Sequence, residues 1–588
     1  MARAFFRRHW RRALLIRERL RLSEDAFHLL LAGGVGVIGG LTRHVFHACN
    51  QFIQLILLGE TGDLLQLAEN LAPWQRLLIP TLGGFVAGST LYWGLRLLGN
   101  PGLSNLLEVV VAGDGRLSFR SAFINALSSL TSISTGASIG REGLIVQLTA
   151  SLASKGGQWA QWPPYRLRLL VACGASAGLA AACNAPIAGA VFAAQVVLGN
   201  FSMNLFAPLV VSSVVAAVIA RGYASVGQWF TVPPFDFTRL SQLPWFVVLG
   251  FLSGLLGALF LKLLSISETA FNKIPVPLYG RLALAGLGVG IIAAVFPEVL
   301  GNGYGATDRL LHGHFAIDFL AGVFLAKLVA TAITVGAGTV GGVFTPTLLL
   351  GAALGSFFGG LLNAINLGGA LPNGAFALVG MGSLLAATTH SPLVAMIMIF
   401  ELSVNYSIMP PLMIACVVST LVARRLHPES IYTEPLRRKG LELERESAKI
   451  GAAAEKTVGD VMREPVPPLR ETATFREIAD RFLVSPNNFL PVVDGERQLI
   501  GVVALQDMKE YLHTGHELNG VIAFDVMRNP PPCLTPNQKI SDALAILLAS
   551  ELRNVPVVNS LKQFRLVGSV SRAEALGLVA QAISASKS

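Results

Sequence analysis

The most informative stretch of this 588-residue chain reads Gly140-Arg141-Glu142-Gly143-Leu-Ile-Val-Gln-Leu148. It places an acidic side chain between two glycines at the start of an apolar run, and Glu142 is the only acidic residue between Ser121 and Arg221. Ionisable residues within membrane segments are costly and are candidates for function. The free N–H groups of a helix N-terminus attract anions, including carboxylates. We therefore predict that Glu142 occupies an anion site when ionised and leaves it when protonated, with a structural Arg141–Glu142 pair as the alternative.

A second element of this kind reads Gly341-Gly342-Val343-Phe344-Thr345-Pro346. Paired glycines let the backbone approach a ligand closely, and proline in the first turn is typical of a helix start. We expect the backbone N–H groups of Val343 and Phe344 to point at an anion. Tyr432, just beyond the last apolar run, has a phenol that can donate to an anion, although a single interfacial tyrosine is more often a membrane anchor.

The composition indicates that both elements lie in a membrane protein. Hydrophobic residues make up 53% of the chain and charged residues 14%, against about 25% charged in ordinary soluble chains. The charged residues are sparse in 25–424 and dense on either side, in 1–24 and in 425–588. A purely cytosolic enzyme is thus excluded, and we predict a basic cytoplasmic segment (1–24), a transmembrane anion-transport domain (25–424), a linker (425–456) that includes Tyr432, and a soluble tail.

The basic residues indicate the membrane topology. Eight arginines lie between Arg3 and Arg21, directly before the first apolar run, and a second basic cluster follows the last run. Cations beside a span are typical of its cytoplasmic side, so the net charge of +10 does not indicate a nucleic-acid partner. We expect a multi-pass protein of the plasma (inner) membrane with both termini in the cytoplasm. Its apolar runs are broken by Gly, Pro and Ser, which is typical of transporters and channels, in which broken helices line a cavity.

Three other patterns carry no chemistry. Gly34-Val-Gly-Val-Ile-Gly39 matches a dinucleotide fingerprint but lies inside the first apolar run, where packing through small residues is commoner. His516-Glu517-Leu-Asn-Gly520 lacks the second histidine of a zinc-protease motif. The five cysteines are scattered without a CxxC pair, which favours neither a disulfide framework nor a zinc site. We therefore expect no metal site and no enzyme.

Together the motifs resemble those of the CLC family of chloride channels and proton/chloride exchangers, in particular its prokaryotic, voltage-gated chloride channel type. The GREG motif (140–143) matches the family's GREGP except that Leu144 replaces the proline, and 342–346 matches its GxFxP. The stretch from Ala387 to Glu401 resembles a third family pattern. The resemblance implies a polytopic α-helical fold of two inverted repeats of tilted, broken helices. It also implies a homodimer in the lipid bilayer, chloride or another small monovalent anion as ligand, and no required cofactor.

The resemblance implies roles for individual residues. Glu142 is the gating glutamate, and the N–H groups of Val343 and Phe344 form the central anion site with the Tyr432 hydroxyl. Further residues beside the anion are Gly140, Arg141, Gly143, Pro101 and Gly102. Tyr432 argues against the family's fluoride-exporting branch, whose members lack this tyrosine.

Two departures from the family pattern bear on mechanism. Asn100-Pro101-Gly102-Leu103-Ser104 stands in place of the family's GSGIP, so Pro101 replaces a serine that ligates the anion. Members with proline there tend to favour nitrate, and we expect relaxed or nitrate-leaning selectivity. Exchangers usually carry Glu-Glu at the positions of Gln195 and Val196, and the second Glu passes protons inward. Because valine cannot titrate, a gated channel is favoured, with a proton-coupled chloride or nitrate antiporter as the alternative.

The tail contains an internal repeat, in which two motifs recur at the same spacing. Asp460-Val-Met-Arg463 recurs as Asp525-Val-Met-Arg528, and Leu490-Pro-Val-Val-Asp494 recurs as Val555-Pro-Val-Val-Asn559. Branched apolar runs that alternate with helical patterns predict two α/β units. The repeat resembles a tandem pair of CBS modules in the cytoplasm.

CBS pairs often bind adenine nucleotides through a Ser or Thr and an Asp after the last strand. The matching residues are Asp507 in the first module (457–515) and Ser571 and Glu574 in the second (522–588). The first module lacks the hydroxyl and the second has Glu for Asp, so a structural role that clamps a dimer stays an equal alternative to nucleotide binding.

Two other classes of function fit less well. A CBS-regulated transporter of magnesium or cobalt would need several membrane carboxylates, because hard cations prefer oxygen ligands. A membrane enzyme would need a metal or nucleophile constellation, which no motif supplies.

Overall fold

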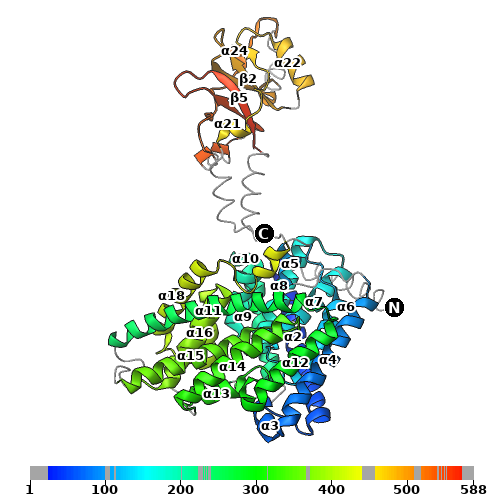
Figure 1. Ribbon diagram of the computed structural model, residues 1–588. Helices are drawn as coiled ribbons and strands as arrows, with labels where there is room; N and C mark the ends of the chain where they lie inside the picture. Colours follow the sequence, from blue (N-terminus) through cyan, green and yellow to red (C-terminus); the bar gives the residue numbers. More distant parts are fainter. Residues whose placement is uncertain are drawn as a thin grey trace. The chain divides into compact units, whose positions relative to one another are not determined.

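The computed structural model describes residues 24–99, 106–111, 114–199, 201–222, 230, 232–233, 235, 240–313, 315–365, 371–439, 457–485, 487–508, 518–539, 542–543, 546–547, 550 and 552–572. The chain divides into two compact units, Met1–Leu443 and Glu444–Ser588. The first is called the membrane unit and the second the tail unit, and each is described by itself (Figure 1).

The membrane unit consists of helices of very unequal length. Among the described residues, eight helical segments are long and apolar enough to cross a membrane, beside shorter apolar helices. In chain order the helices are α2 (Glu24–Leu58), α3 (Leu64–Asn70), α4 (Pro73–Leu97), α5 (Leu106–Val111), α6 (Phe119–Ser134), α7 (Glu142–Trp159), α8 (Pro164–Cys183), α9 (Pro186–Phe192), η1 (Ala193–Leu198), α10 (Met203–Gly222), η2 (Leu240–Gln242), α11 (Leu243–Lys273), α12 (Leu278–Val295), η3 (Pro297–Val299), α13 (Tyr304–Leu311), α14 (Ile317–Gly336), α15 (Phe344–Ala364), α16 (Asn373–Thr389), α17 (Pro392–Ser403), α18 (Met409–Leu426) and α19 (Glu434–Arg438).

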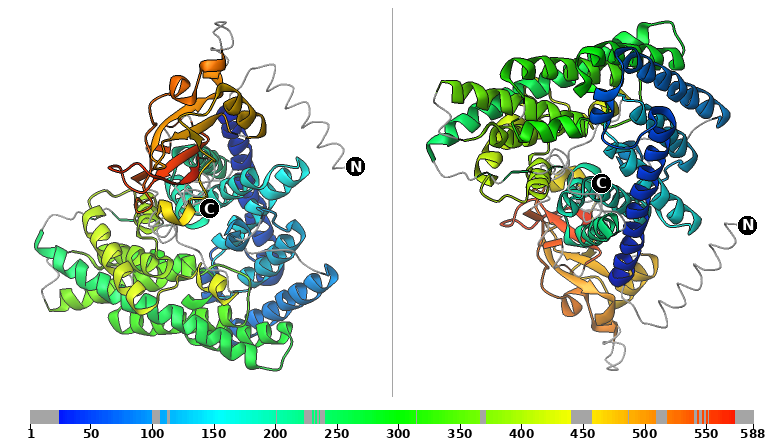
Figure 2. Two further views of the ribbon diagram at one scale, coloured as in Figure 1. Left: turned by 90° about the horizontal axis from the view of Figure 1, so that it is seen from above. Right: turned by 90° about the horizontal axis from the view of Figure 1, so that it is seen from below.

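Helix pairs in the membrane unit pack through small residues. The closest pairs include α4 with α12 and α15 with α16, which lie side by side in Figures 1 and 2. A Cβ added at Gly351 of α15 would collide with the carbonyl of Gly380 on α16, so only glycine permits this approach. Such contacts are typical of membrane helices, which associate by close packing because lipid is as apolar as their side chains.

Two breaks in the helices have the same construction. After α8, Asn184 adopts a left-handed φ of 56°, and Pro186 then starts α9. After α16, His390 adopts a left-handed φ of 54°, and Pro392 starts α17. A left-handed residue ends a helix, and a proline in the first turn fits the start of the next one. The two breaks therefore turn α8–α9 and α16–α17 in equivalent ways.

The first turn of α9 is capped from α17. The Glu401 carboxylate accepts hydrogen bonds of 2.8 Å from the backbone N–H groups of Ile187 and Ala188. Beyond this turn α9 continues into η1, a π-helical turn that includes Gln195 and Val196. Such turns are rare and are frequent at functional sites.

The tail unit contains two similar α/β halves. Its elements are α21 (Val458–Val461), β1 (Leu469–Arg470), α22 (Phe475–Val484), β2 (Phe489–Val493), β3 (Leu499–Ala504), η4 (Leu518–Gly520), α24 (Ala523–Val526), β4 (Asn554–Val558) and β5 (Leu566–Ser571). The antiparallel pairs β2–β3 and β4–β5 each have a register shift, at Val492/Val493 and Val557/Val558. These shifts fall at equivalent positions of the sequence repeat.

The two halves of the tail unit exchange backbone hydrogen bonds. The N–H of Val502 in β3 donates to the Arg528 carbonyl (3.1 Å), and the N–H of Arg463 donates to the Ser569 carbonyl in β5 (2.9 Å). Each Asp-Val-Met-Arg motif thus ends against the closing strand of the other half.

Candidate anion pathway

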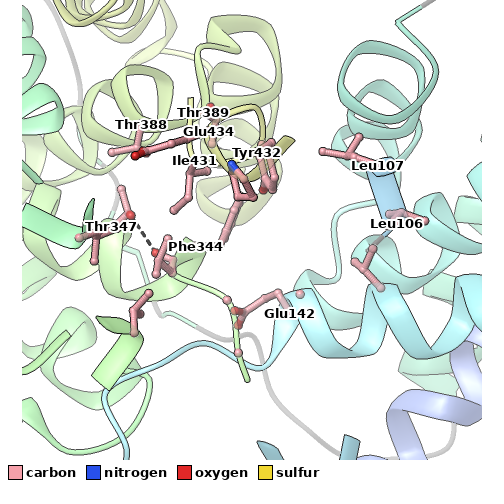
Figure 3. Close-up of a pocket in the computed structure, with 18 of the residues that line it drawn as sticks. Leu106, Leu107, Glu142, Phe344, Thr347, Thr388, Thr389, Ile431, Tyr432 and Glu434 are labelled. Atoms are coloured by element: carbon pink, nitrogen blue, oxygen red, sulfur yellow. Dashed lines mark hydrogen bonds between the residues drawn. The ribbon is translucent and has the colours of Figure 1, made fainter. Parts of the chain in front are cut away.

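A cavity of about 650 Å³ lies in the membrane unit. It brings together residues from three distant parts of the sequence, because Glu142, Phe344 and Tyr432 all line it (Figure 3). Gly143 and Val343 line it too, whereas Gly140 and Arg141 lie in the loop that leads to α7. Pro101 and Gly102 lie outside the described residues.

Two backbone hydrogen bonds hold the helix starts at this cavity side by side. The N–H of Gly140 donates to the Gly342 carbonyl (2.6 Å), and the N–H of Gly342 donates to the Gly140 carbonyl (2.9 Å). Helices α7 and α15 begin directly after this bridge, at Glu142 and Phe344. A Cβ at Gly140 would collide with the Glu142 carboxylate, which explains the glycine. The positive ends of two helix dipoles therefore meet beside one carboxylate.

Glu142 is buried, with 1% of its surface exposed. Its Oε1 accepts a hydrogen bond of 2.5 Å from the Tyr304 hydroxyl, and its Oε2 has no hydrogen-bond partner among the described residues. The ring of Tyr304 lies 5.4 Å from that of Phe230, and the Arg141 guanidinium lies 5.3 Å from the Tyr304 centroid. A carboxylate with a single neutral donor is less firmly bound than one in an ion pair, which suits a group that has to move.

Tyr304 was not foreseen from the sequence. It is separated from Glu142 by 162 positions and follows Gly301 and Gly303, both with positive φ. A tyrosine after paired glycines at a helix start is a weak signal by itself, because nothing local shows what its hydroxyl faces.

Tyr432 faces the cavity from the loop before α19. Its ring packs edge-on against Phe192 (5.6 Å between centroids), and its neighbour Ile431 donates a backbone hydrogen bond of 3.1 Å to the Thr388 carbonyl. Among the described residues no hydrogen bond engages the Tyr432 hydroxyl. The phenol is therefore held in place by its ring and backbone, with its donor available to a ligand.

Charged residues line another part of the cavity, and Figure 3 shows Glu434 across it from Glu142. Arg438 donates to Glu434 (2.7 Å) and forms a second ion pair with Glu268. Lys439 forms an ion pair of 2.6 Å with Glu108 on α5. We call Glu268, Glu434, Arg438 and Lys439 the Arg438 cluster. In the ion pair between Lys439 and Glu108, only Glu108 is deeply buried.

The two positions that distinguish exchangers in the resembling family lie in η1. Val196 is partly buried and is not among the residues that line the cavity. The Gln195 Oε1 is buried without a hydrogen-bond partner among the described residues. Neither side chain can carry a proton by titration.

Comparisons with known proteins identify the family to which this chain belongs. The family model described as "Voltage gated chloride channel" matches residues 83–424, and the CBS domain model matches 458–514 and 522–581. The chain belongs to the CLC family. The family and the fold that the motifs predicted are thereby confirmed, including the tandem CBS pair. Its function is CLC-type chloride transport, and the family consists of channels and transporters and not of enzymes.

Named relatives agree with this assignment. A putative chloride channel protein, ClcB-like, of Ralstonia nicotianae is 41% identical over 414 residues, which cover 70% of this chain and 96% of that protein. The voltage-gated ClC-type chloride channel ClcB of Escherichia coli is 36% identical over 420 residues, covering 69% and 98%. The aligned part thus spans about seven tenths of this chain and nearly the whole of each relative.

Solved structures share the fold at low identity. A slow cyanobacterial Cl⁻/H⁺ antiporter has a TM-score of 0.62 and 24% identity, covering 71% of this chain and 98% of its own. A eukaryotic CLC transporter has a TM-score of 0.58 and 19% identity, covering 94% and 98%. The fold thus occurs with and without a long tail.

In the tail unit the first of the predicted nucleotide-binding residues, Asp507, pairs with an arginine. The Asp507 carboxylate accepts hydrogen bonds of 2.8 and 3.0 Å from Nε of Arg528, and it is only 9% exposed. Ser571 ends β5 opposite Asn554. Glu574 lies outside the described residues. The Asp507 carboxylate, which the sequence predicted as a nucleotide-binding group, is therefore held by Arg528 of the other half.

Proposed function

We propose that this chain is a gated CLC-type anion channel in which the Glu142 carboxylate is the gate. The observation that carries the proposal is the shared cavity: Glu142, the α15 start at Phe344 and Tyr432 all line it. A carboxylate beside two helix N-termini occupies the kind of place where an anion is stabilised.

The anion binds between α15 and the tyrosine. The N–H groups of Val343 and Phe344 belong to the free N-terminal donors of α15, and the Tyr432 hydroxyl is a third donor. Three neutral donors and a helix dipole stabilise a monovalent anion such as chloride without trapping it as a fixed cation would.

The gate works by competition. The Gly140–Gly143 turn brings the Glu142 carboxylate to the helix ends, with Arg141 behind it. Ionised Glu142 competes with the anion for the positive end of the helices. Protonated Glu142 is neutral and loses that attraction, so a passing anion displaces it. Flux is therefore expected to rise as pH falls.

Val196 supports passive conduction. Exchangers of the family usually pass protons inward through a glutamate at this position, and the valine side chain cannot take up a proton. Proton-coupled exchange is the second candidate, and one observation favours it: Glu268 and Glu434 line the same cavity as Glu142 and could replace the missing proton acceptor.

Proton movement driven by a chloride gradient distinguishes the two. Purified protein in liposomes at clamped voltage is expected to pass chloride without moving protons uphill. Uphill proton transport would overturn the channel proposal in favour of exchange. The variants Glu268→Gln and Glu434→Gln would then identify the acceptor, because only its loss uncouples the protons.

Pro101 and Gly102 underlie the proposed anion preference. Proline has neither a hydroxyl nor an N–H to donate, so Pro101 cannot favour chloride over nitrate by hydrogen bonding. We expect nitrate to compete with chloride at similar concentrations in flux assays, whereas strong preference for chloride would contradict this.

The assembly is a homodimer in the plasma (inner) membrane, with the N-terminal arginines and the tail in the cytoplasm. The basic residues 1–24 and the cluster after α18 support this orientation. Of the two roles open to the tail, we favour clamping of the dimer over nucleotide binding, since Arg528 already pairs with Asp507. A thermal shift of the tail with ATP, ADP or AMP would instead support nucleotide binding at Asp507, Ser571 and Glu574.

A further inference from the structure

The loop before α13 is held by a buried lysine that the proposed gating does not use. Lys327 on α14 is fully buried, and its Nζ donates to the carbonyls of Val299 (2.9 Å) and Gly301 (2.8 Å). A lysine among apolar helices is costly and needs partners of this kind. These bonds fix the loop that leads into Tyr304, the residue that donates to Glu142.

The same face of α14 also holds the loop before Glu142. Thr331 lies one turn after Lys327, and its hydroxyl shares a hydrogen bond of 2.9 Å with Ser138. Residues four apart lie on one face of a helix. The N–H of Gly301 also donates to the Gly136 carbonyl (3.0 Å), which joins the two loops directly. One helix therefore positions both sides of the Tyr304–Glu142 hydrogen bond.

The Tyr304 hydroxyl links three functional elements. It donates to Oε1 of Glu142 (2.5 Å) and accepts a long hydrogen bond of 3.4 Å from Oγ1 of Thr345, in the first turn of α15. Its ring contacts both Phe230 and the Arg141 guanidinium. The hydroxyl thus has little freedom to turn away from the carboxylate.

We infer that Tyr304 is a positioning residue for the gate, whose hydroxyl sets where the ionised Glu142 carboxylate rests and how firmly it is held there. The inference rests on the proposed function of Glu142. A hydrogen bond donated to a carboxylate stabilises its ionised form. Removal of the hydroxyl therefore leaves the carboxylate easier for an anion to displace, and acid-driven flux is expected to begin at a higher pH.

Other charged or titratable groups face Glu142 or Tyr304 and stay unchanged when only the Tyr304 hydroxyl is removed. They lie in the loop before α7, on α2, at the end of α8 and before α19: Arg141, Arg43, Cys183 and Tyr432. A shift of the pH–flux curve in Tyr304→Phe therefore reports the lost hydroxyl.

The experiment measures chloride efflux from liposomes against pH for the wild type, Tyr304→Phe, Glu142→Gln and the double variant. Tyr279→Phe is the matched control, because its ring packs against Phe85 and Tyr92 away from the cavity lining. Tyr304→Phe is expected to move the midpoint up by about one to two pH units, the value of one charge-assisted hydrogen bond. The control is expected to leave it in place, and the two Glu142→Gln variants are expected to coincide.

Each result decides separately on the gate and on its positioning residue. An unmoved midpoint in Tyr304→Phe, with pH-independent flux in Glu142→Gln, overturns the role of Tyr304 alone. A shift by Tyr304→Phe that persists in the Glu142→Gln background also overturns it, because the hydroxyl then acts elsewhere. Persistent pH dependence in Glu142→Gln overturns the gate and with it this inference. Lys327→Met is expected to move the midpoint in the same direction, with no further shift when added to Tyr304→Phe.

Discussion

The cavity carries carboxylates in two contrasting settings. Glu142 is buried with one neutral hydroxyl donor, whereas Glu268 and Glu434 are held by the cation of Arg438. Glu268 is 49% exposed on its side chain and Arg438 36%, so water screens their attraction. A buried carboxylate without a cationic partner can exchange its proton and its position, while an exposed ion pair keeps its charge. Under the proposed function, enclosure and a neutral partner distinguish the gate, Glu142, from the other acids that line the cavity.

Removal of the gate carboxylate should have the largest effect. In Glu142→Ala no titratable group competes with the anion, so flux is expected to be nearly independent of pH between about pH 4 and pH 8. Wild-type flux is expected to rise as pH falls. Efflux from liposomes at stepped pH checks this, and strong pH dependence in the variant would refute the gate assignment.

A methyl group placed against the gate should come next. In Gly140→Ala the new Cβ meets Oε2 of Glu142, the end of a side chain that can shift, and lies 3.3 Å from the Gly342 carbonyl. We expect a displaced pH–flux curve with a loss of stability of no more than about 1 kcal/mol.

Gly156→Ala is the control for this change, because a Cβ at Gly156, also on α7, meets no atom within 4 Å. It is expected to be neutral or stabilising by up to about 1 kcal/mol. Thermal unfolding of both variants in detergent tests the pair, and equal melting temperatures would show that the Gly140 turn is not tightly built.

Removal of the Tyr432 hydroxyl should have a moderate effect. Tyr432→Phe keeps the ring contact with Phe192 but removes one donor to the anion. One neutral hydrogen bond contributes about 1 kcal/mol, so anion affinity is expected to fall about fivefold with the conduction path intact. Calorimetric titration with chloride measures this, and unaltered affinity would return Tyr432 to the role of a membrane anchor.

The Arg438 cluster should give the smallest effect. Arg438→Gln removes a screened cation, so flux is expected to change by less than about threefold, more at low ionic strength than at high. The midpoint of the pH–flux curve is expected to stay where it is. A midpoint shift as large as that predicted for Tyr304→Phe would show that the Arg438 cluster acts on the gate as strongly as Tyr304 does. It would contradict the distinction between Glu142 and the ion-paired acids.

The sequence predicted those parts of the site that local chemistry reveals. The helix starts at Glu142 and Phe344 are marked by neighbouring glycines, and the internal repeat predicted the paired halves of the tail. The partners of these residues were not readable, because they are distant along the chain. Tyr304 reaches Glu142, and Lys327 reaches Val299 and Gly301, only through tertiary packing. Likewise Asp507 looked free for a nucleotide until Arg528 of the other half was seen to hold it.

We propose that the Glu142 carboxylate and the transported anion compete for the N-terminal ends of α7 and α15. Anomalous diffraction from bromide-soaked crystals of the wild type and Glu142→Gln tests it most directly. This competition predicts bromide near Val343, Phe344 and Tyr432 in both proteins. It also predicts an additional bromide in the variant, at the place that the ionised carboxylate occupies in the wild type. Identical bromide positions in the two proteins would contradict it.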